Sequence, residues 1–142
     1  KPLTETKFSK TTTKLKTTNE LENMKHGTKI HYIFETEDFT NPKHEEVKKL
    51  LKHQEIKNIK EAKIFKEYEF YFKEENESYH GIIDLMLEYQ NQIIIIDYKL
   101  KDITDENYKK QLQGYKNYIE NKTHKSVTTY LYSITQDILK EI

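Results

Sequence analysis

The sequence predicts a single α/β domain in which helices flank a mixed central sheet. Two apolar runs, at about 79–89 and 92–100, flank the polar pair at 90–91, and this pattern predicts two strands joined by a tight turn. A helical pattern follows from Thr104, and another apolar run covers 127–133. A crossover helix between strands gives parallel neighbours, whereas the preceding strands form an antiparallel meander, so the sheet should be mixed.

Composition limits both the size of the core and the kinds of chemistry. The chain has 142 residues, which suits one domain, and only 35% of them are hydrophobic. Eleven tyrosines and six phenylalanines supply large buried areas. All 24 basic residues are lysine and the formal net charge is zero, which argues against a purely electrostatic DNA-binding protein.

The absence of cysteine excludes several functional classes. Disulfides, zinc–cysteine sites, iron–sulfur clusters and thiol catalysis all need cysteine, and the chain has none. No apolar stretch approaches membrane-spanning length and no secretory segment is seen near the start, so we expect a cytoplasmic protein with no membrane partner. The chain begins at Lys1 rather than at a methionine, which suggests a domain cut from a longer polypeptide.

The N-terminal segment is expected to differ from the rest of the chain. Residues 1–20 are rich in lysine and threonine, with five lysines against one glutamate up to Thr17. They could form a basic arm, a short helix over 8–15, a patch that touches nucleic acid, or a solvated linker. The single domain is then expected to cover 21–142.

Two helices are expected before the first central strand. Residues 21–37 have an apolar pattern compatible with one side of a helix. Asn41-Pro42, followed by Glu45 and Glu46, predicts the start of a second helix, because it offers a capping side chain, a proline at the first helical position and acids in the first turn. The section from 53 to 61 is polar and ambiguous.

The remaining elements follow from alternation and from helical spacing. Residues 62–72 alternate and predict a strand, and 73–79 should be a charged turn. Glu67 and Glu69 in this strand could supply an extra carboxylate, but a solvated strand edge is the expectation for both. Thr104 is expected to cap a helix whose apolar side carries regularly spaced residues, namely Tyr108, Leu112, Tyr115 and Ile119. Residues 137–140 resemble a fragment of helix.

Two aspartates should face each other across the predicted hairpin. If Gln90-Asn91 forms the turn, Tyr89 lies opposite Gln92, and counting back places Asp84 opposite Asp97. Like charges at directly opposed positions, roughly 5 Å apart, destabilise a sheet. A divalent cation bound between the two carboxylates would explain why the fold tolerates them.

Lys99 should join Asp97 on the same face, because side chains alternate along a strand. An acid, any residue and then lysine is a frequent pattern in a chain that is 34% charged, so the tripeptide alone proves little. The alternative is that Asp97 and Lys99 form a surface ion pair at a strand end. That alternative leaves Asp84 unexplained within an apolar run.

These residues occur in an order that resembles the PD-(D/E)XK nuclease superfamily, and within it the RecB/AddA-type nuclease domain of bacterial helicase–nucleases. The family patterns are a GTxxH helix, a GxxD strand, a DYK strand and a QxxxY helix. They appear here as Gly27-Thr28-Lys29-Ile30-His31, Gly81-Ile82-Ile83-Asp84, Asp97-Tyr98-Lys99 and Gln111-Leu112-Gln113-Gly114-Tyr115. The resemblance covers most of the chain, from about 24 to 133.

The resemblance implies a restriction-endonuclease-like core and a role for each motif. Asp84 and Asp97 would hold one or two Mg²⁺ or Mn²⁺ ions, with the backbone carbonyl of Tyr98 and the imidazole of His31 as further ligands. Lys99 would orient the attacking water or neutralise charge beside the scissile phosphate. From the adjacent helix, two residues would brace the site or contact the DNA strand, namely Gln111 and Tyr115.

The resemblance therefore implies a divalent-metal-dependent deoxyribonuclease of exonuclease type, acting in DNA end processing and recombinational repair. The expected partners are DNA and a helicase domain or subunit outside this chain, because residues 1–142 contain no P-loop. A stand-alone repair or restriction-type endonuclease and a catalytically silent DNA-binding scaffold are the alternatives. The scaffold is disfavoured because Asp84, Asp97 and Lys99 are all present.

Overall fold

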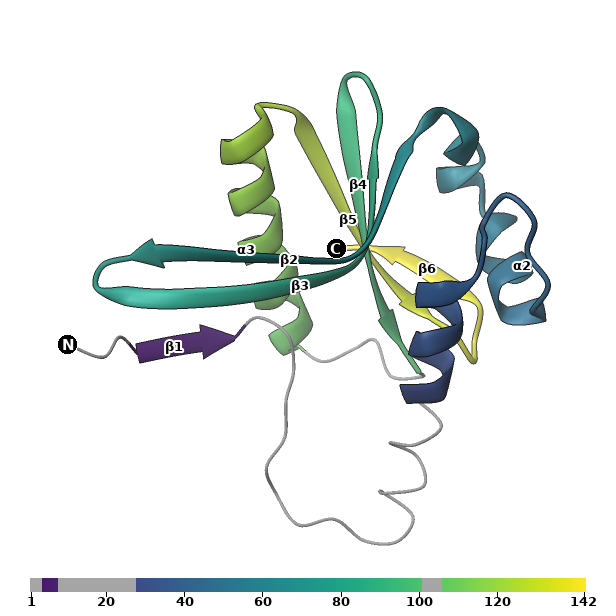
Figure 1. Ribbon diagram of the computed structural model, residues 1–142, viewed down its shortest axis with the longest axis horizontal. Coiled ribbons are helices and arrows are strands. Elements are labelled where there is room, and N and C mark those ends of the chain that lie inside the picture. The colour runs from purple at the N-terminus through teal and green to yellow at the C-terminus, as the bar shows by residue number, and fades with distance from the viewer. Residues whose placement is uncertain (1–3, 8–27, 101–105) are drawn as a thin grey trace, which may run out of the picture.

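A computed structural model of the chain describes residues 4–7, 28–100 and 106–142. Its centre is a six-stranded sheet in the order β1-β3-β4-β5-β6, with β2 paired to β3, and helices lie on both faces (Figure 1). The strands are β1 (Thr4–Lys7), β2 (Lys63–Glu74), β3 (Glu77–Glu88), β4 (Gln92–Lys99), β5 (Ser126–Ser133) and β6 (Ile138–Glu141). The predicted α/β class and the mixed sheet are confirmed.

The hairpin between β3 and β4 has the register expected from its tight turn. Tyr89 N–H donates to Gln92 O at 2.8 Å, and the paired residues run from Glu88↔Ile93 to Leu85↔Ile96. The same count would place Asp84 opposite Asp97, but the pairs end one position earlier. The two strands thus stop pairing where the two aspartates begin.

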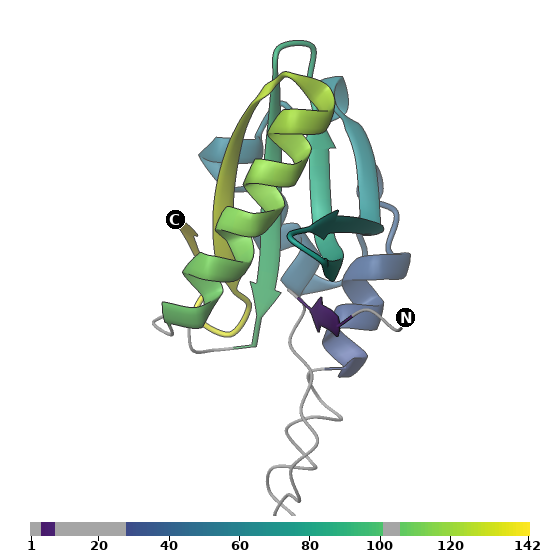
Figure 2. The same ribbon diagram turned by 90° about the vertical axis from the view of Figure 1, so that its left-hand side faces the viewer.

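The crossover helix is also confirmed. Helix α3 (Glu106–Thr123) connects β4 to β5, and these two strands pair in parallel from Gln92↔Ser126 to Lys99↔Ser133. Figure 2 shows α3 lying across one face of the sheet. The predicted cap at Thr104 lies outside the described residues.

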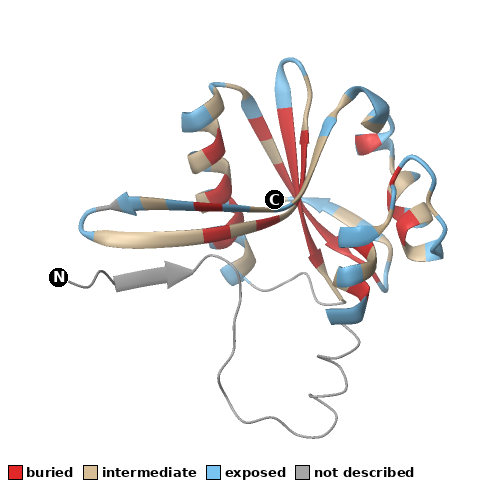
Figure 3. Cartoon of the chain, in the orientation of Figure 1, coloured by how far each residue is buried: buried red, intermediate tan, exposed pale blue. Residues whose placement is uncertain are grey.

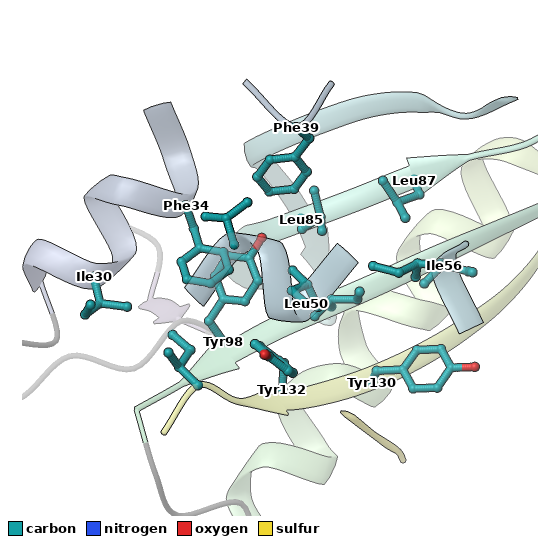
Figure 4. Packing of buried hydrophobic residues seen from close by; sticks show 14 residues of the cluster. Ile30, Phe34, Phe39, Leu50, Ile56, Leu85, Leu87, Tyr98, Tyr130 and Tyr132 are labelled. Atoms are coloured by element: carbon teal, nitrogen blue, oxygen red, sulfur yellow. The ribbon is translucent and has the colours of Figure 1, made fainter. Parts of the chain in front are cut away.

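The sheet separates two apolar layers. On the α3 side, Leu112, Tyr115 and Ile119 pack with strand residues that include Ile93 and Ile95. On the other side, a helix over 28–36 and helix α2 (Glu45–Leu51) cover the remaining face. Figure 4 shows this second layer, with labelled residues Ile30, Phe34, Phe39, Leu50, Ile56, Leu85, Leu87, Tyr98, Tyr130 and Tyr132.

Helix α2 begins later than the sequence predicted. Its first residue is Glu45 and its N-cap is His44, which makes no capping hydrogen bond with its side chain. Glu37 instead reaches this helix start, because its Oε2 accepts hydrogen bonds from Lys43 N–H and from His44 N–H at 2.7 Å. The acids predicted for the first turn, Glu45 and Glu46, are in place.

The section that the sequence left ambiguous contains two short 3₁₀ turns. They are η1 (Gln54–Ile56) and η2 (Ile59–Glu61), and Ile56 is fully buried. The turn predicted over 73–79 is shorter than expected. It consists of Glu75 and Asn76, both with positive φ (51° and 68°), which is the backbone of a two-residue type I′ hairpin turn.

The end of the chain is a strand rather than the expected helix fragment. β6 pairs antiparallel with β5 from Ser133↔Ile138 to Tyr130↔Glu141. Asp137 has a φ of 54° just before it, which reverses the chain within a few residues. Four residues are too few to form an isolated helix, whereas they gain hydrogen bonds by adding to an existing sheet.

The N-terminal segment contributes one strand that the sequence did not predict. β1 pairs in parallel with the first half of β3, from Thr4↔Glu77 to Lys7↔His80, and Figure 1 shows it beside the β2–β3 hairpin. The short helix considered for 8–15 lies outside the described residues. In Figure 3, burial is concentrated in the centre of the sheet rather than in this hairpin arm.

The β2–β3 ladder is interrupted at one position. Pairs flank the interruption at Lys66↔Leu85 and Tyr68↔Ile83, while Glu67 and Asp84 are missing from the ladder. Glu67 has a φ of 49°. We call this position the kink, and it lies beside the point where β3 and β4 stop pairing. Within the described residues, no helix is both long and apolar enough to cross a membrane.

Candidate metal centre

A cavity of about 300 Å³ opens at the end of the β3–β4 pairing. The helix over 28–36, strands β2, β3 and β4, and helix α3 all contribute to its wall. Its lining residues are His31, Glu67, Ile82, Asp84, Asp97, Tyr98, Lys99, Leu100 and Gln111. The cavity thus gathers most of the residues that the sequence motifs singled out.

Asp84 lies at the centre of this group. Its Oδ2 accepts a hydrogen bond from Tyr98 N–H at 2.8 Å and lies 3.7 Å from His31 Nε2. β3 and β4 no longer pair at this position, so the Tyr98 N–H donates to the Asp84 carboxyl group instead of to a backbone carbonyl of β3. Burial, and after it the charge of Asp97, raises the pKa of Asp84 to about 8, although His31 opposes the shift.

Asp97 is buried in an unusual way for a carboxylate. Its side chain is only 6% exposed, and its Oδ2 lies 2.9 Å from Lys99 Nζ. Among the described residues, this oxygen nevertheless has no partner with hydrogen-bond geometry. A buried acceptor without a hydrogen bond costs free energy, and the ion pair with Lys99 offsets part of this cost for Asp97.

Lys99 is enclosed by Asp97 and by α3. Its Nζ lies 4.2 Å from the centre of the Tyr108 ring, which is a cation–π distance. Burial lowers the pKa of Lys99, but the charge of Asp97 and the bond to it outweigh this effect and raise the pKa overall. Lys99 thus remains a cation at neutral pH. The surface ion pair considered from the sequence is excluded, since both side chains are largely buried.

Gln111 and Tyr115 form a chain of contacts that leads from α3 to β3. Gln111 Nε2 donates to the Tyr115 hydroxyl at 3.2 Å, and that hydroxyl donates to Ile82 O at 2.9 Å. Gln111 lines the cavity, whereas Tyr115 is fully buried behind it. Of the two roles expected for Tyr115, bracing agrees with this position. Contact with DNA does not.

His31 approaches from the opposite face of the sheet. It lies on the helix over 28–36, its side chain is partly exposed, and its ring meets the Tyr98 ring edge-on at 5.9 Å. The Tyr98 ring packs against Phe34 at 4.5 Å, which fixes the helix against β4. His31 is therefore positioned through apolar packing, while its Nε2 faces Asp84.

The glycine of the GxxD pattern has a packing reason. Gly81 pairs with Phe70 across the β2–β3 ladder, and the Phe70 ring covers it so closely that an added Cβ would lie 2.3 Å from Phe70 Cζ. The same ring stacks on Tyr118 of α3 at 4.3 Å. Gly81 thus lets α3 approach the strand that carries Asp84.

Glu67 is the cavity residue that sequence reasoning placed elsewhere. Glu67 and Glu69 were expected at a solvated strand edge, and Glu69 is exposed there, where it bonds to Tyr71 and His80. Glu67 instead lines the cavity together with Asp84. Partial burial raises the pKa of Glu67, and the neighbouring Asp84 and His31 oppose this shift only in part. Nothing in the local sequence distinguishes Glu67, because its position depends on the backbone at the kink.

The donor set suits a hard divalent cation. It offers carboxylate oxygens and a backbone carbonyl, which Mg²⁺ prefers, and one imidazole, which favours Mn²⁺. Within residues 28–100 and 106–142, no three histidine, aspartate or glutamate side chains are close enough to enclose an ion by themselves. Mg²⁺ usually keeps several waters and uses only one or two carboxylates, so Asp84 and Asp97 match its common mode of binding.

Comparison with known proteins gives one partial similarity. No model of a known protein family matches this chain. A stretch of 68 residues is 38% identical to part of an ATP-dependent helicase/nuclease subunit from Clostridioides difficile (strain 630). The match covers 41% of this chain and only 5% of that much longer protein. Part of the chain is thus similar to a small part of a helicase/nuclease protein, which agrees with the resemblance read from the motifs.

Proposed function

We propose that this chain is a divalent-metal-dependent DNA nuclease domain with a restriction-endonuclease-like core of the RecB/AddA type. It would hydrolyse phosphodiester bonds in the manner of an exonuclease during DNA end processing and recombinational repair in the cytoplasm. One observation carries the proposal: Asp84, Asp97 and Lys99 line a single cavity at the point where two strands diverge. The partial similarity to a helicase/nuclease protein supports it.

Four groups would hold the ion. They are the carboxylates of Asp84 and Asp97, the backbone carbonyl of Tyr98, and the imidazole of His31. The buried Oδ2 of Asp97, which has no hydrogen bond within the described part of the chain, fits an oxygen that needs a cation. Bound Mg²⁺ or Mn²⁺ would supply Lewis acidity, which lowers the pKa of water and offsets charge on the phosphate.

Lys99 would act as a permanent cation rather than as a base. Its raised pKa keeps it protonated at neutral pH, so it can donate hydrogen bonds to the attacking water or to the scissile phosphate but cannot accept a proton. Such a charge acts strongly in a site of low dielectric. The contact with Tyr108 fixes its Nζ beside Asp97.

Gln111 and Tyr115 would position the centre from behind. Their hydrogen bonds end on Ile82 O, two residues before Asp84, so they hold β3 at the depth of the cavity. Such support residues normally influence activity through the geometry of the groups they hold. DNA would reach the cavity from its open side, delivered by a helicase domain or subunit outside this chain.

The decisive experiment measures hydrolysis of linear single- and double-stranded DNA by the purified chain with Mg²⁺ or Mn²⁺. We expect cleavage that EDTA stops. Asp97→Ala and Lys99→Ala should each lower the rate on the order of a thousandfold or more, as expected for groups that act as a unit. Lys109→Ala is the matched control, because Lys109 is an exposed lysine of α3 that pairs only with the surface residue Glu106 in the described chain.

Equal cleavage by the wild type and by Asp97→Ala would eliminate the proposed centre. Equal loss in Lys99→Ala and Lys109→Ala would show that general lysine charge, rather than the cavity, supports the activity. Circular dichroism and thermal unfolding of every variant, measured in EDTA, separate a lost site from a lost fold.

A further inference from the structure

Lys66 connects two parts of the molecule that carry different groups of the proposed centre. It lies on β2 directly before the kink and pairs with Leu85, the residue after Asp84. Its side chain reaches the second apolar layer, where its Nζ donates a hydrogen bond to Glu37 O. The contact therefore links the strand pair that carries Asp84 to the end of the helix over 28–36.

The ammonium group of Lys66 is held from two sides. Besides the bond to Glu37 O, its Nζ lies 3.9 Å from the centre of the ring of Phe39, a buried residue of the same layer. Burial lowers the pKa of Lys66, while the charges of Asp38, Glu37 and Glu35 act in the opposite direction. A hydrogen bond and a cation–π contact both depend on direction, so together they fix where the end of the helix lies.

Glu37 is the point at which the helix over 28–36 ends and the approach to α2 begins. Its N–H donates to Ile33 O at 2.9 Å, which continues the hydrogen bonds of the first helix. Its carboxylate accepts from N–H groups at the start of α2, including that of His44 at 2.7 Å. A cation is favoured beside the last carbonyl groups of a helix. Lys66 thus binds a residue that joins both helices of this layer.

Apolar packing also holds this helix on the sheet. Phe34 packs against Tyr98 at 4.5 Å and against Tyr132 at 6.4 Å (Figure 4). Such packing is non-directional, so it tolerates a small slide of the helix along its axis. His31 lies roughly 9 Å along that axis from Glu37, and a slide at the anchored end moves the imidazole by the same amount. Groups of a metal site need placement within about 0.5 Å.

We propose that Lys66 is a positioning residue of the metal centre, which anchors the helix over 28–36 so that His31 faces Asp84. The inference rests on the proposed function, because it concerns the placement of a group that would hold the ion. His31 Nε2 lies 3.7 Å from Asp84 Oδ2, and the β2–β3 ladder ties Lys66 to the strand of Asp84. Lys66 is not among the residues of the cavity wall, so it acts through the helix.

The charge of Lys66 gives this proposal a distinctive sign. On charge alone, removing a cation near the cavity should strengthen the binding of a divalent cation. Losing an anchor should weaken that binding, because His31 is then placed less precisely. Lys63 is the matched control, since it is an exposed lysine of the same strand and its Nζ lies 5.4 Å from the ring of Phe65, in the layer on the α3 side.

The experiment is a titration of the 142-residue chain with Mn²⁺ alone, followed by electron paramagnetic resonance. Lys66→Met keeps most of the apolar stem and should weaken Mn²⁺ binding roughly tenfold, at the low end of the effect for groups that support a metal ligand. Lys63→Met should leave the binding unchanged. The double variant Lys66→Met with His31→Ala should bind no more weakly than His31→Ala alone, because Lys66 acts through His31.

Hydrogen exchange in EDTA tests the anchor without metal. Backbone amides of residues 28–36 should exchange faster in Lys66→Met than in the wild type, whereas those of β4 and β5 should keep wild-type rates. Phe39→Leu removes the ring beneath Nζ and should repeat both the weaker Mn²⁺ binding and its dependence on His31. This second variant decides the question if Lys66→Met exchanges faster throughout β4 and β5.

The outcomes separate this inference from the proposed function. Unchanged or tighter Mn²⁺ binding by Lys66→Met would overturn the role of Lys66 while the centre stands, provided that Asp97→Ala loses Mn²⁺. An additive loss in the double variant would also overturn it, because Lys66 would then act on a group other than His31. If the wild-type chain binds no Mn²⁺, the proposed centre fails and the role of Lys66 fails with it.

Discussion

The β3–β4 hairpin contains two regions built on opposite principles. Near the turn, every residue from Leu85 to Glu88 is paired with β4, and the isoleucines opposite are buried. Beyond Leu85, β3 and β4 no longer pair with each other, and carboxylates, a lysine and a glutamine line a cavity. The first region, the paired half, stabilises the fold through apolar burial. In the second region, the open half, β3 and β4 do not pair, and charged and polar side chains face the same cavity.

The contrast teaches that apolar stabilisation and the gathering of charged and polar groups are separated within a single hairpin. Apolar residues in the paired half exclude water from both faces of the sheet. The open half lies at the end of the same strands, so its side chains are held rigidly without having to stabilise the chain. Sites built on regular elements position their groups more precisely than sites on loops.

The largest expected effect is a cavity in the paired half. Ile95 is fully buried opposite Met86, so Ile95→Ala should lower the free energy of unfolding by about 2–5 kcal/mol. Asp84→Asn, in the open half, should raise it in EDTA at pH 7, because the folded wild type has to keep Asp84 protonated far above the pKa of an ordinary aspartate. Urea denaturation in EDTA measures both. A loss of similar size in the two variants would erase the distinction between the halves.

The second effect is a dependence on pH that belongs to the open half. The pKa of Asp84 is about 8 in the folded protein, against 3.8 for an ordinary aspartate. Between these values the folded state holds the proton more tightly, so this group makes the metal-free protein less stable as pH rises from about 4 to 8, by at most about 1.4 kcal/mol for each pKa unit. The dependence should level off above pH 8.

Comparing the wild type with Asp84→Asn across that pH range isolates this contribution, because the other titrating groups are common to both proteins. We expect the wild type to lose stability relative to the variant as pH rises. Parallel curves would show that Asp84 titrates normally.

A third effect tests how α3 packs against β3, the strand that carries Asp84. Gly81→Ala would bring a Cβ to 2.3 Å from Phe70 Cζ, so the ring must move away from Tyr118. We expect a loss of about 1–3 kcal/mol, as for other overpacked sites. The double variant Gly81→Ala with Phe70→Leu removes the ring and should recover part of the loss. No recovery would place the strain elsewhere.

The smallest effect concerns the hydrogen bonds that brace β3. Tyr115→Phe keeps the ring and removes the hydroxyl between Gln111 and Ile82 O, which should cost about 1–2 kcal/mol because the hydrogen bonds that this hydroxyl makes are lost. DNA cleavage should fall modestly, and less than in Asp97→Ala. A cleavage loss as large as that of Asp97→Ala would give Tyr115 a direct role.

Where apolar residues recur with the period of a strand or a helix, the predictions made from the sequence agree with the structure. The tight turn at 90–91 and the flanking apolar runs predicted the hairpin register from Glu88 to Leu85, and the crossover helix predicted the parallel pairing of β4 with β5. Capping signals were less accurate. Asn41-Pro42 marked a helix start three residues early, since Glu37, from outside the helix, supplies the capping acceptor.

The features that sequence could not reveal depend on backbone breaks and on distant partners. Register counting placed Asp84 opposite Asp97, but it could not show that pairing ends before them or that Asp84 bonds to Tyr98 N–H. Alternation assigned Glu67 to a solvated edge because it assumes an unbroken strand. The last strand was mistaken for a helix because four residues carry too little periodicity to decide, and β5 determines their conformation.

The kink also affects how the chain meets its own copies. Within the described residues, β2 pairs with β3 alone, so its outer edge offers unused N–H and C=O groups to any other strand. The left-handed residue in its middle turns that edge and divides it into two shorter segments. A straightened β2 would present a continuous template for intermolecular pairing, so we expect the bend to disfavour aggregation through this edge.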